Sequence, residues 1–536
     1  MPHDSPDHAA CQVNPDREEM SKFLIRNAVI LDGLGSPPCP GDLSVKDGLI
    51  AEVGPNLQPG GAAVVNAAGR YLAPGFIDAH CHDDLICLRD PQRLEKITQG
   101  VTTVVTGNCS FSLYPYAPSS RESLRKHFSG LLGKTEGEEV FPDLDTYRSA
   151  LGEMALNVVS LTGHAALRLA TVGDARRPAT ASEIAAMQDL LSNQLSQGAA
   201  GCSIGLVYPP SAFAELDELV ALGKTTRDHD GVLAAHIRSY EGNLLVAIAE
   251  FLEVLRLSGA KGLLSHLQCA GRPNWGLMPA ALGLLEEARR GGIDVEFDMY
   301  PYLAGSSYLL QLLPIDFAES GVDGIIDRCR NREDRERLKR RVEKEGKVSL
   351  IGWGNVSLSG SPSQPELEGL SMVKAAARKR VEPFDLMLRL LEEDAGQTSI
   401  VLHQLSEPDL QAAFQHSLHM VGSDGLPRPG TKMHPRAYGT FPRVLDNLSR
   451  EQNWFSLEEA VRKMTSAPAR RFNLARRGEL RPGMVADLVL FEPDVEDVAT
   501  YENPIALAKG ITDVWVSGRA VLTDAQPTGA MPGRLI

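Results

Sequence analysis

The sequence predicts an α/β protein in which a TIM-like (β/α)8 barrel is combined with a small, discontinuous β-sandwich domain built from both chain ends. Between residues 71 and 477, short runs that are apolar throughout alternate with helical patterns. Such runs are typical of parallel strands buried on both faces. Strand patterns separated by Gly and Pro lie instead at both ends of the chain. The length of 536 residues suits a barrel with an accessory domain.

The two chain ends are predicted to share one domain. Residues 1–21 are polar and without periodicity, which predicts a disordered tail, and they lack the pattern of a signal peptide. Residues 22–70 and 478–536 consist of short β runs, which indicate meandering antiparallel strands. Because segments at opposite ends of a chain can pair, these two form the predicted β-sandwich, interrupted by the barrel at 71–477.

Nine apolar runs compete for the eight strand positions of the barrel, so one must lie outside it. We expect that run to be SIVLH, residues 399–403. Crossover helices are clearest at 181–198 and 241–259, each closed by a glycine. Residues 303–375, which include a highly charged run, predict an insertion over the barrel mouth. The nine runs cover residues 73–80, 101–109, 157–164, 199–206, 231–236, 261–266, 292–300, 399–403 and 419–424.

Composition excludes several classes of function. The formal net charge is −15, whereas a nucleic-acid or anionic-lipid partner requires a basic face. The sequence contains no stretch of 18 apolar residues, so we expect no membrane span. The eight cysteines form no CxxC pair. They predict a reducing, cytoplasmic location, where cysteines are free thiols or metal ligands.

Metal-type ligands end several of the predicted strands. In a parallel barrel every strand opens its carboxyl end onto one face, so residues distant in sequence converge there. Imidazole, thiolate and carboxylate are ligands of zinc and similar ions. His80 and His82 lie two apart on a strand and therefore point to one side. The strand-end residues are His80, His82, Cys109, His164, His236, His266 and Asp424.

Each of these residues has a structural alternative when taken singly. A strand-end histidine can be a hydrogen-bonded structural residue, and this interpretation stays open for His164. Cys109 can be a buried, inert thiol, and Asp424 can be a turn residue before Gly425. The joint pattern favours chemistry, because a zinc ion activates water near neutral pH and a carboxylate can transfer protons. Together these groups suffice for amide hydrolysis.

The chain resembles the amidohydrolase superfamily and, more closely, its N-acyl-D-amino-acid deacylases (D-aminoacylases). The resemblance extends over about residues 23–533. Its motifs include PGFIDAHCHDD, GVTTVVTGNCSFSLYP, AAHIRSYEGN, SHLQCAGRPNWG, DMYPYLAGSSYL, VGSDGLP, HPRAYGTFPRVL and TYENP.

The resemblance implies hydrolysis of N-acyl-D-amino acids to a carboxylate and a free D-amino acid by metal-bound hydroxide. It implies one tightly bound zinc and allows a second, weaker site. Gln268 stands where many relatives have a lysine, which weakens any expected preference for acidic D-amino acids and favours neutral ones. The implied roles are tight zinc site for Cys109, His236 and His266; second metal site for His80 and His82, with Cys109 able to bridge; general base and acid for Asp424; and substrate carboxylate for Tyr300, Ser306 and Arg436.

Two other functions compete with this interpretation. One is a cyclic-amide hydrolase of the hydantoinase type, or a xenobiotic amidase, of the same superfamily. Most hydantoinase-type enzymes use a modified lysine where this chain has Cys109, and they lack the Tyr300 and Arg436 pair. The other is a catalytically inactive binding protein, in which ligand residues would be missing, although every one is present here. For Tyr300 and Ser306, packing at the barrel rim is the alternative role.

Overall fold

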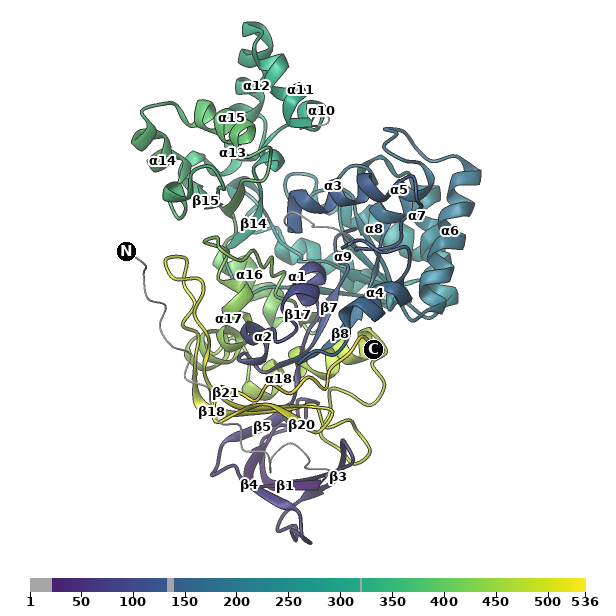
Figure 1. Ribbon diagram of the computed structural model, residues 1–536, viewed down its shortest axis with the longest axis vertical. Helices are drawn as coiled ribbons and strands as arrows, with labels where there is room; N and C mark the ends of the chain where they lie inside the picture. The colour runs from purple at the N-terminus through teal and green to yellow at the C-terminus, as the bar shows by residue number, and fades with distance from the viewer. Residues whose placement is uncertain (1–21, 133–138, 319–320) are drawn as a thin grey trace, which may run out of the picture.

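The computed structural model describes residues 22–132, 139–318 and 321–536, so the predicted tail at 1–21 lies outside the described residues. Three parts follow one another along the long axis of the molecule (Figure 1). A β-sheet from both chain ends lies at the bottom of this view, parallel strands with their helices lie in the middle, and a helical insertion projects at the top.

Both chain ends enter one nine-stranded sheet, with the order β21–β20–β19–β18–β5–β1–β2–β3 and with β4 paired to β1. Strands β5 and β18 join the two ends in antiparallel pairing, with Leu488 opposite Pro74. Phe23 stacks on Trp515 in the adjoining core, at 5.6 Å between ring centroids. The strands are β1 (Lys22–Ile30), β2 (Cys39–Lys46), β3 (Leu49–Gly54), β4 (Ala63–Asn66), β5 (Tyr71–Pro74), β18 (Leu488–Glu496), β19 (Lys509–Val516), β20 (Arg519–Thr523) and β21 (Gln526–Pro527).

The middle of the molecule contains two parallel sheets, ordered β17–β13–β12–β11–β10–β9 and β6–β7–β8. Strands β8 and β9 are separated by Leu161 alone. At the other junction, Ala79 N donates a hydrogen bond to Val421 O at 3.2 Å, which links β6 to β17. The strands are β6 (Phe76–Asp78), β7 (Val101–Thr106), β8 (Asn157–Ser160), β9 (Thr162–Gly163), β10 (Gly201–Gly205), β11 (Val232–His236), β12 (Lys261–Leu264), β13 (Val295–Met299) and β17 (His419–Val421).

Helices alternate with these parallel strands. Helix α6 (Ala181–Ser196) begins with a capping box between Thr180 and Glu183. Helix α8 (Leu244–Ser258) ends at Gly259, whose φ of 72° is left-handed. The others are α1 (Asp84–Arg89), α2 (Leu94–Ile97), α3 (Arg121–Leu132), α4 (Leu144–Leu151), α5 (His164–Thr171), α7 (Leu216–Asp228), α9 (Met278–Arg290), α16 (Glu407–Gln415), α17 (Arg436–Arg443), α18 (Leu457–Met464) and α19 (Ser466–Arg471).

The insertion has a sheet and a core of its own. Strands β14 (Ala304–Tyr308), β16 (Ser399–His403) and β15 (Val356–Gly360) form an antiparallel sheet, which places the SIVLH run outside the parallel strands. Its hydrophobic cluster extends from Leu309 to Leu402, beyond the predicted limit at residue 375. Its helices are α10 (Ile315–Ala318), α11 (Gly321–Cys329), α12 (Arg332–Lys344), α13 (Lys347–Ile351), α14 (Met372–Lys379) and α15 (Pro383–Glu393).

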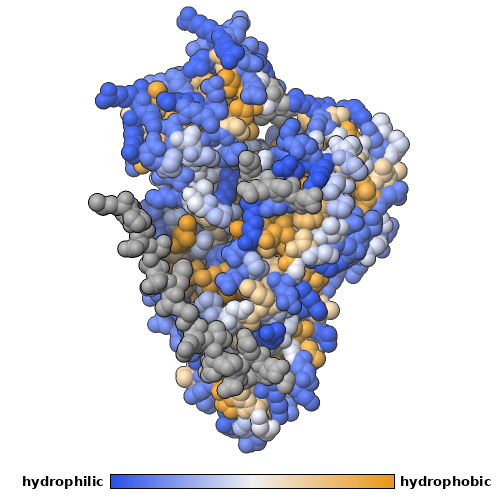
Figure 2. Space-filling model, viewed as in Figure 1, coloured by the Kyte–Doolittle hydropathy of each residue, from blue (hydrophilic) through white to orange (hydrophobic). Residues whose placement is uncertain are grey.

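The charged run predicted as a solvated helix forms α12. Only Leu338 and Val342 are buried on it, and hydrophilic residues cover this end of the molecule (Figure 2). Among the described residues, no helix has both the length and the apolar composition needed to cross a membrane. The seven cysteines in the described ranges are free thiols, and all but Cys39 are buried.

Candidate metal and catalytic site

The predicted ligand residues meet at the carboxyl ends of the parallel strands. Because these ends open on the same face, five separate segments of the chain reach one cavity. Each side chain follows or ends a strand: His80 and His82 follow β6, Cys109 follows β7, His236 ends β11, His266 follows β12 and Asp424 follows β17. All of these residues except His80 line the cavity, and His80 contacts Cys109 outside the lining.

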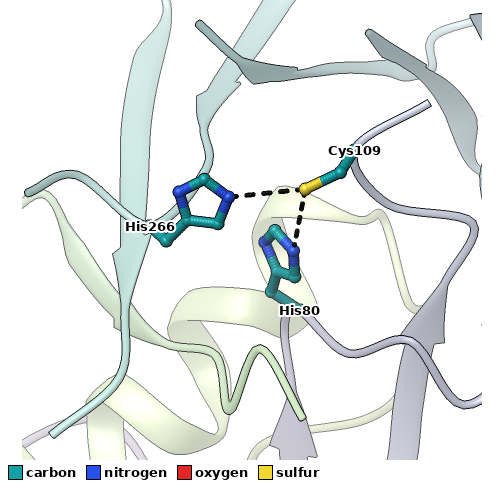
Figure 3. A group of neighbouring side chains, drawn as sticks. All are labelled: His80, Cys109 and His266. Carbon is teal, nitrogen blue, oxygen red and sulfur yellow. Dashed lines mark hydrogen bonds between the residues drawn. The ribbon is translucent and has the colours of Figure 1, made fainter. Parts of the chain in front are cut away.

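Cys109 lies between two histidines. Its Sγ atom is 3.4 Å from Nε2 of His80 and 3.4 Å from Nε2 of His266 (Figure 3). The three ligand atoms lie within 4.8 Å of one another, and all three side chains are buried. The His236 ring stands edge-on to that of His266, at 4.6 Å between centroids. One thiolate with neighbouring imidazoles is a donor set that fits zinc.

A second group shares His80 with the first. Oδ1 of Asp424 lies 3.2 Å from Nε2 of His82 and 3.6 Å from Nε2 of His80. These three ligand atoms also fall within 4.8 Å of one another. The two groups thus form one continuous cluster of potential ligands around His80.

Three of the converging residues have left-handed backbone conformations. Cys109 has φ 54°, His266 has φ 36° and Asp424 has φ 47°. Non-glycine residues adopt such values uncommonly, at a cost of about 1–3 kcal/mol each. Strain of this kind gathers where the surrounding structure holds side chains in a required geometry, and here it marks the same three strand ends.

Charge pairing inside the cluster keeps its acidic groups ionised. Burial alone would raise the pKa of the Cys109 thiol, but the nearby His80 and His266 hold it well below its usual value. Burial likewise opposes ionisation of Asp424, yet the Arg436 guanidinium and a hydrogen bond with His82 hold its pKa well below the ordinary range. A thiolate and a carboxylate are the forms that bind metal or accept a proton.

The histidines divide into two kinds. Burial alone would lower the pKa of His82, but hydrogen bonds with Asp424 and Cys109 raise it to about 9. Burial and the neighbouring His266 lower the pKa of His236 to about 4, so this imidazole stays neutral. A neutral imidazole is the form that ligates metal.

Asp298 contacts the cluster, although the sequence reasoning did not single it out. It lies in β13, and one of its carboxylate oxygens is 3.2 Å from Nδ1 of His80. Its other oxygen accepts a hydrogen bond from the backbone N of His266 at 2.9 Å. A carboxylate on the far ring nitrogen of a metal-binding histidine fixes the ring orientation. Its place in a predicted strand that ends in DMY was the available signal.

The three predicted carboxylate-binding residues border the same cluster. Nη2 of Arg436 lies 2.9 Å from Oδ2 of Asp424, and the guanidinium sits 4.5 Å from the centroid of the Tyr300 ring. Arg436 and Tyr300 are each only 1% exposed, so both are fixed groups rather than mobile surface residues. Ser306, on β14 of the insertion, lines the cavity together with Tyr300.

The cavity is also lined by charged residues that the sequence reasoning missed. Lys347 begins α13 of the insertion, and its Nζ lies 3.3 Å from Oε1 of Glu241. Both line the cavity with Gln268, whose Oε1 accepts a hydrogen bond from the Tyr300 hydroxyl at 3.3 Å. Lys347 ends the charged run assigned to a solvated helix face, so composition gave no signal of its position.

His164, left open above, lies apart from the metal-type cluster. Its Nε2 is 2.7 Å from Oε1 of Glu218, and Arg168 contacts the same carboxylate at 2.6 Å. All three side chains are buried. Such a paired, buried histidine has a structural role, which was the alternative considered for it.

Comparison with known proteins identifies the family. Residues 63–309 and 372–522 match the model of the amidohydrolase family. The chain belongs to the amidohydrolase family. A D-aminoacylase from Alcaligenes xylosoxydans xylosoxydans is 36% identical over 96% of this chain and 97% of its own length. The gap in the family match, residues 310–371, lies inside the insertion.

Two solved structures resemble this amidohydrolase along nearly its whole length. A D-aminoacylase studied for its binuclear metal centre has a TM-score of 0.81 and 34% identity, and it covers 96% of this chain and 99% of its own. An N-acyl-D-glutamate deacylase from Bordetella bronchiseptica, in complex with zinc and a phosphonate mimic of the tetrahedral intermediate, gives the same values. Similarity to these structures extends over the terminal sheet as well as the parallel strands.

Proposed function

We propose that this amidohydrolase is a zinc-dependent N-acyl-D-amino-acid deacylase that releases a carboxylate and a free D-amino acid. The observation that supports it most is Cys109 placed 3.4 Å from both His80 and His266, with Asp424 beside them. A thiolate in this position suits one metal ion next to a proton-transfer carboxylate. Relatives that act on N-acyl-D-amino acids support the choice of substrate.

Cys109, His236 and His266 would hold the tight zinc, and His80 and His82 would serve a second, weaker site with Cys109 bridging. The buried thiolate and neutral His236 imidazole fit this assignment. A zinc ion held there would supply Lewis-acid chemistry, which polarises the scissile carbonyl and lowers the pKa of bound water.

Asp424 is the proposed proton carrier. Its carboxylate is ionised and lies beside the histidines, so it can accept a proton from the attacking water. The same carboxylic acid then donates the proton to the leaving nitrogen, which departs as the amine of the D-amino acid. Its backbone N donates to His80 O at 2.7 Å, and this bond helps to fix its place in the cluster.

Arg436, Tyr300 and Ser306 are proposed to bind the α-carboxylate of the substrate. The planar guanidinium can hold a carboxylate with two hydrogen bonds. Its place between Asp424 and Tyr300 would set that carboxylate next to the proton carrier. The buried Tyr300 hydroxyl, whose pKa burial raises above its usual value, stays a neutral donor.

The amino-acid side chain is proposed to be neutral. Gln268 offers an amide where a lysine would add charge, and Lys347 has its charge balanced by Glu241 at 3.3 Å. We further propose that the parallel strands form a (β/α)8 barrel, that the terminal sheet folds as a β-sandwich, and that the enzyme acts in the cytoplasm on a small-molecule N-acyl amino acid without nucleic-acid or membrane partners.

A substrate panel tests the proposal. The zinc-loaded protein is assayed with N-acetyl-D-methionine, N-acetyl-D-glutamate, their L-enantiomers and a hydantoin, and release of the amino acid is measured. We expect the D-methionine derivative to be hydrolysed fastest and the L-enantiomers to be left intact. Turnover of the hydantoin alone would contradict the deacylase proposal, and equal rates for D and L would contradict its stereochemistry.

A further inference from the structure

A buried hydrogen-bond network lies beneath the candidate site, where β6 meets β17. Its centre is Asp78, a fully buried carboxylate two residues before His80. Oδ1 of Asp78 accepts from the backbone N of Ser423 at 2.7 Å and from the backbone N of His80 at 3.3 Å. Its Oδ2 accepts from Ser423 Oγ at 2.6 Å and from Lys96 Nζ at 2.6 Å. One side chain therefore connects both strand ends.

Lys96 completes the network from α2. Its side chain is 1% exposed, and its Nζ also donates to Ser423 Oγ at 3.2 Å and lies 3.5 Å from Asp83. Ser423 Oγ accepts a further bond from the backbone N of Gly425 at 3.0 Å. The backbone N and the Oγ of Ser423 thus connect β6, α2 and the turn that contains Asp424.

The ends of β6 and β17 pack closely against each other. Gly422 packs against His80, because a Cβ at this glycine would lie 2.6 Å from the His80 Cβ. Asp424 has its left-handed φ of 47° between Ser423 and Gly425. A buried lysine with carboxylate partners adds little net stability compared with apolar packing. Its presence here is better explained by a requirement for fixed geometry.

We propose that Lys96 and Ser423 are positioning residues, which act through Asp78 to fix the Asp424 carboxylate against His80 and His82. None of the three faces the cavity, so their effect on the reaction is indirect. The rate measurement below rests on the proposed deacylase function, whereas the zinc-binding measurement does not.

A matched pair of substitutions tests the proposal. Ser423→Ala removes one buried hydroxyl from the network. Ser258→Ala removes a fully buried hydroxyl at the end of α8, where Oγ donates to Val254 O at 2.7 Å and accepts from Ala260 N at 3.3 Å. Each full-length variant is measured for Tm, for the zinc Kd by titration of metal-free protein, and for kcat and KM on N-acetyl-D-methionine.

We expect both variants to lose a similar amount of Tm, whereas only Ser423→Ala loses about 10-fold or more in kcat, with KM little changed. It should also weaken binding of a second zinc by His80 and His82 by about 10-fold, because Asp78 also accepts a hydrogen bond from the backbone N of His80. Loss of a group behind a metal ligand typically costs about 10- to 100-fold in affinity or activity. Lys96→Met removes the cation from the network, and we expect it to lower kcat and weaken zinc binding more than Ser423→Ala does.

Equal kcat and equal zinc Kd for Ser423→Ala and Ser258→Ala would overturn the proposal and leave the network a purely structural one. If Lys96→Met does not fold, the two serine variants still decide. If the wild type hydrolyses no member of the panel, the deacylase function fails, and the zinc Kd values alone decide whether the network positions the ligands.

Discussion

The two walls of the cavity differ in how firmly their residues are held. On the wall formed by the parallel strands, Cys109, His266 and Asp424 are buried at strand ends, in strained backbone conformations. On the insertion wall, Lys347 comes from a helix outside the parallel strands, and its side chain is 33% exposed. Fixed groups suit the bond-breaking chemistry, where small displacements are costly. Partly exposed groups such as Lys347 suit substrate selection, because substrate specificity depends on the loops and insertions around a site.

The strongest test of this comparison is Cys109→Ala on the wall formed by the parallel strands. The alanine removes the thiolate between His80 and His266, so we expect the protein to lose its bound zinc and, with it, measurable hydrolysis. Elemental analysis of the purified variant checks the metal, and Cys202→Ala, a buried thiol on β10 away from the cavity, is the control. One zinc per chain in Cys109→Ala would overturn the ligand assignment.

Asp424→Asn should separate metal binding from proton transfer. The amide keeps the shape of the side chain but cannot accept a proton, so the rate should fall by at least about 10²-fold, the lower range for a lost acid–base group. Zinc content should stay near that of the wild type, because Cys109, His236 and His266 are intact. Near-normal kcat would remove Asp424 from the mechanism.

Where the cavity lining includes Lys347 of the insertion, the expected effects are smaller and concern selectivity. Gln268→Lys adds a cation to a wall where Lys347 is already balanced by Glu241. We expect the ratio of kcat/KM for N-acetyl-D-glutamate to that for N-acetyl-D-methionine to rise by about 10-fold, which corresponds to 1.4 kcal/mol of added interaction. Gln268→Met is the uncharged control. An unchanged ratio in both variants would show that the substrate side chain binds elsewhere.

The last expected effect concerns stability rather than activity, and it arises outside the cavity, at Asp497. Burial raises its pKa to about 6, although Arg443 at 3.1 Å opposes the rise. The raised pKa means that the folded state binds a proton on Asp497 more tightly than the unfolded state does. The destabilising effect of this buried carboxyl therefore decreases as the pH falls from about 6 to 4. The free energy of unfolding of the wild type, relative to Asp497→Asn, should rise over that range, by about 3 kcal/mol at most. A constant difference would contradict the raised pKa.

The residues with the largest expected effects are also those that could be predicted from the sequence. The strand-end residues could be recognised because parallel strands must open on one face, and His80, Cys109, His266 and Asp424 do lie together. The continuous apolar runs likewise identified the parallel strands, and the surplus run SIVLH lies outside them, as expected.

Other features depend on contacts that no local pattern encodes. Lys347 belongs to a charged run whose composition is typical of solvent exposure, and only the docking of α13 brings it to the cavity. Asp78 is the one acidic residue of β6 and Asp298 is one of two in β13, and the sequence around them does not indicate which residues they contact. The insertion extends beyond residue 375 because α15 and β16 also pack in its hydrophobic cluster, a contact that no local pattern encodes.

The pairing of β5 with β18 has a consequence for how the chain is made. Ribosomal synthesis delivers residues 71–74 more than 400 residues before their antiparallel partner at Leu488. During that interval β5 presents unpaired backbone groups on the side that β18 later covers, and such edges promote association between nascent chains. The last 50 residues therefore cover the exposed edge of β5, and a chain that stops short of β18 is expected to aggregate.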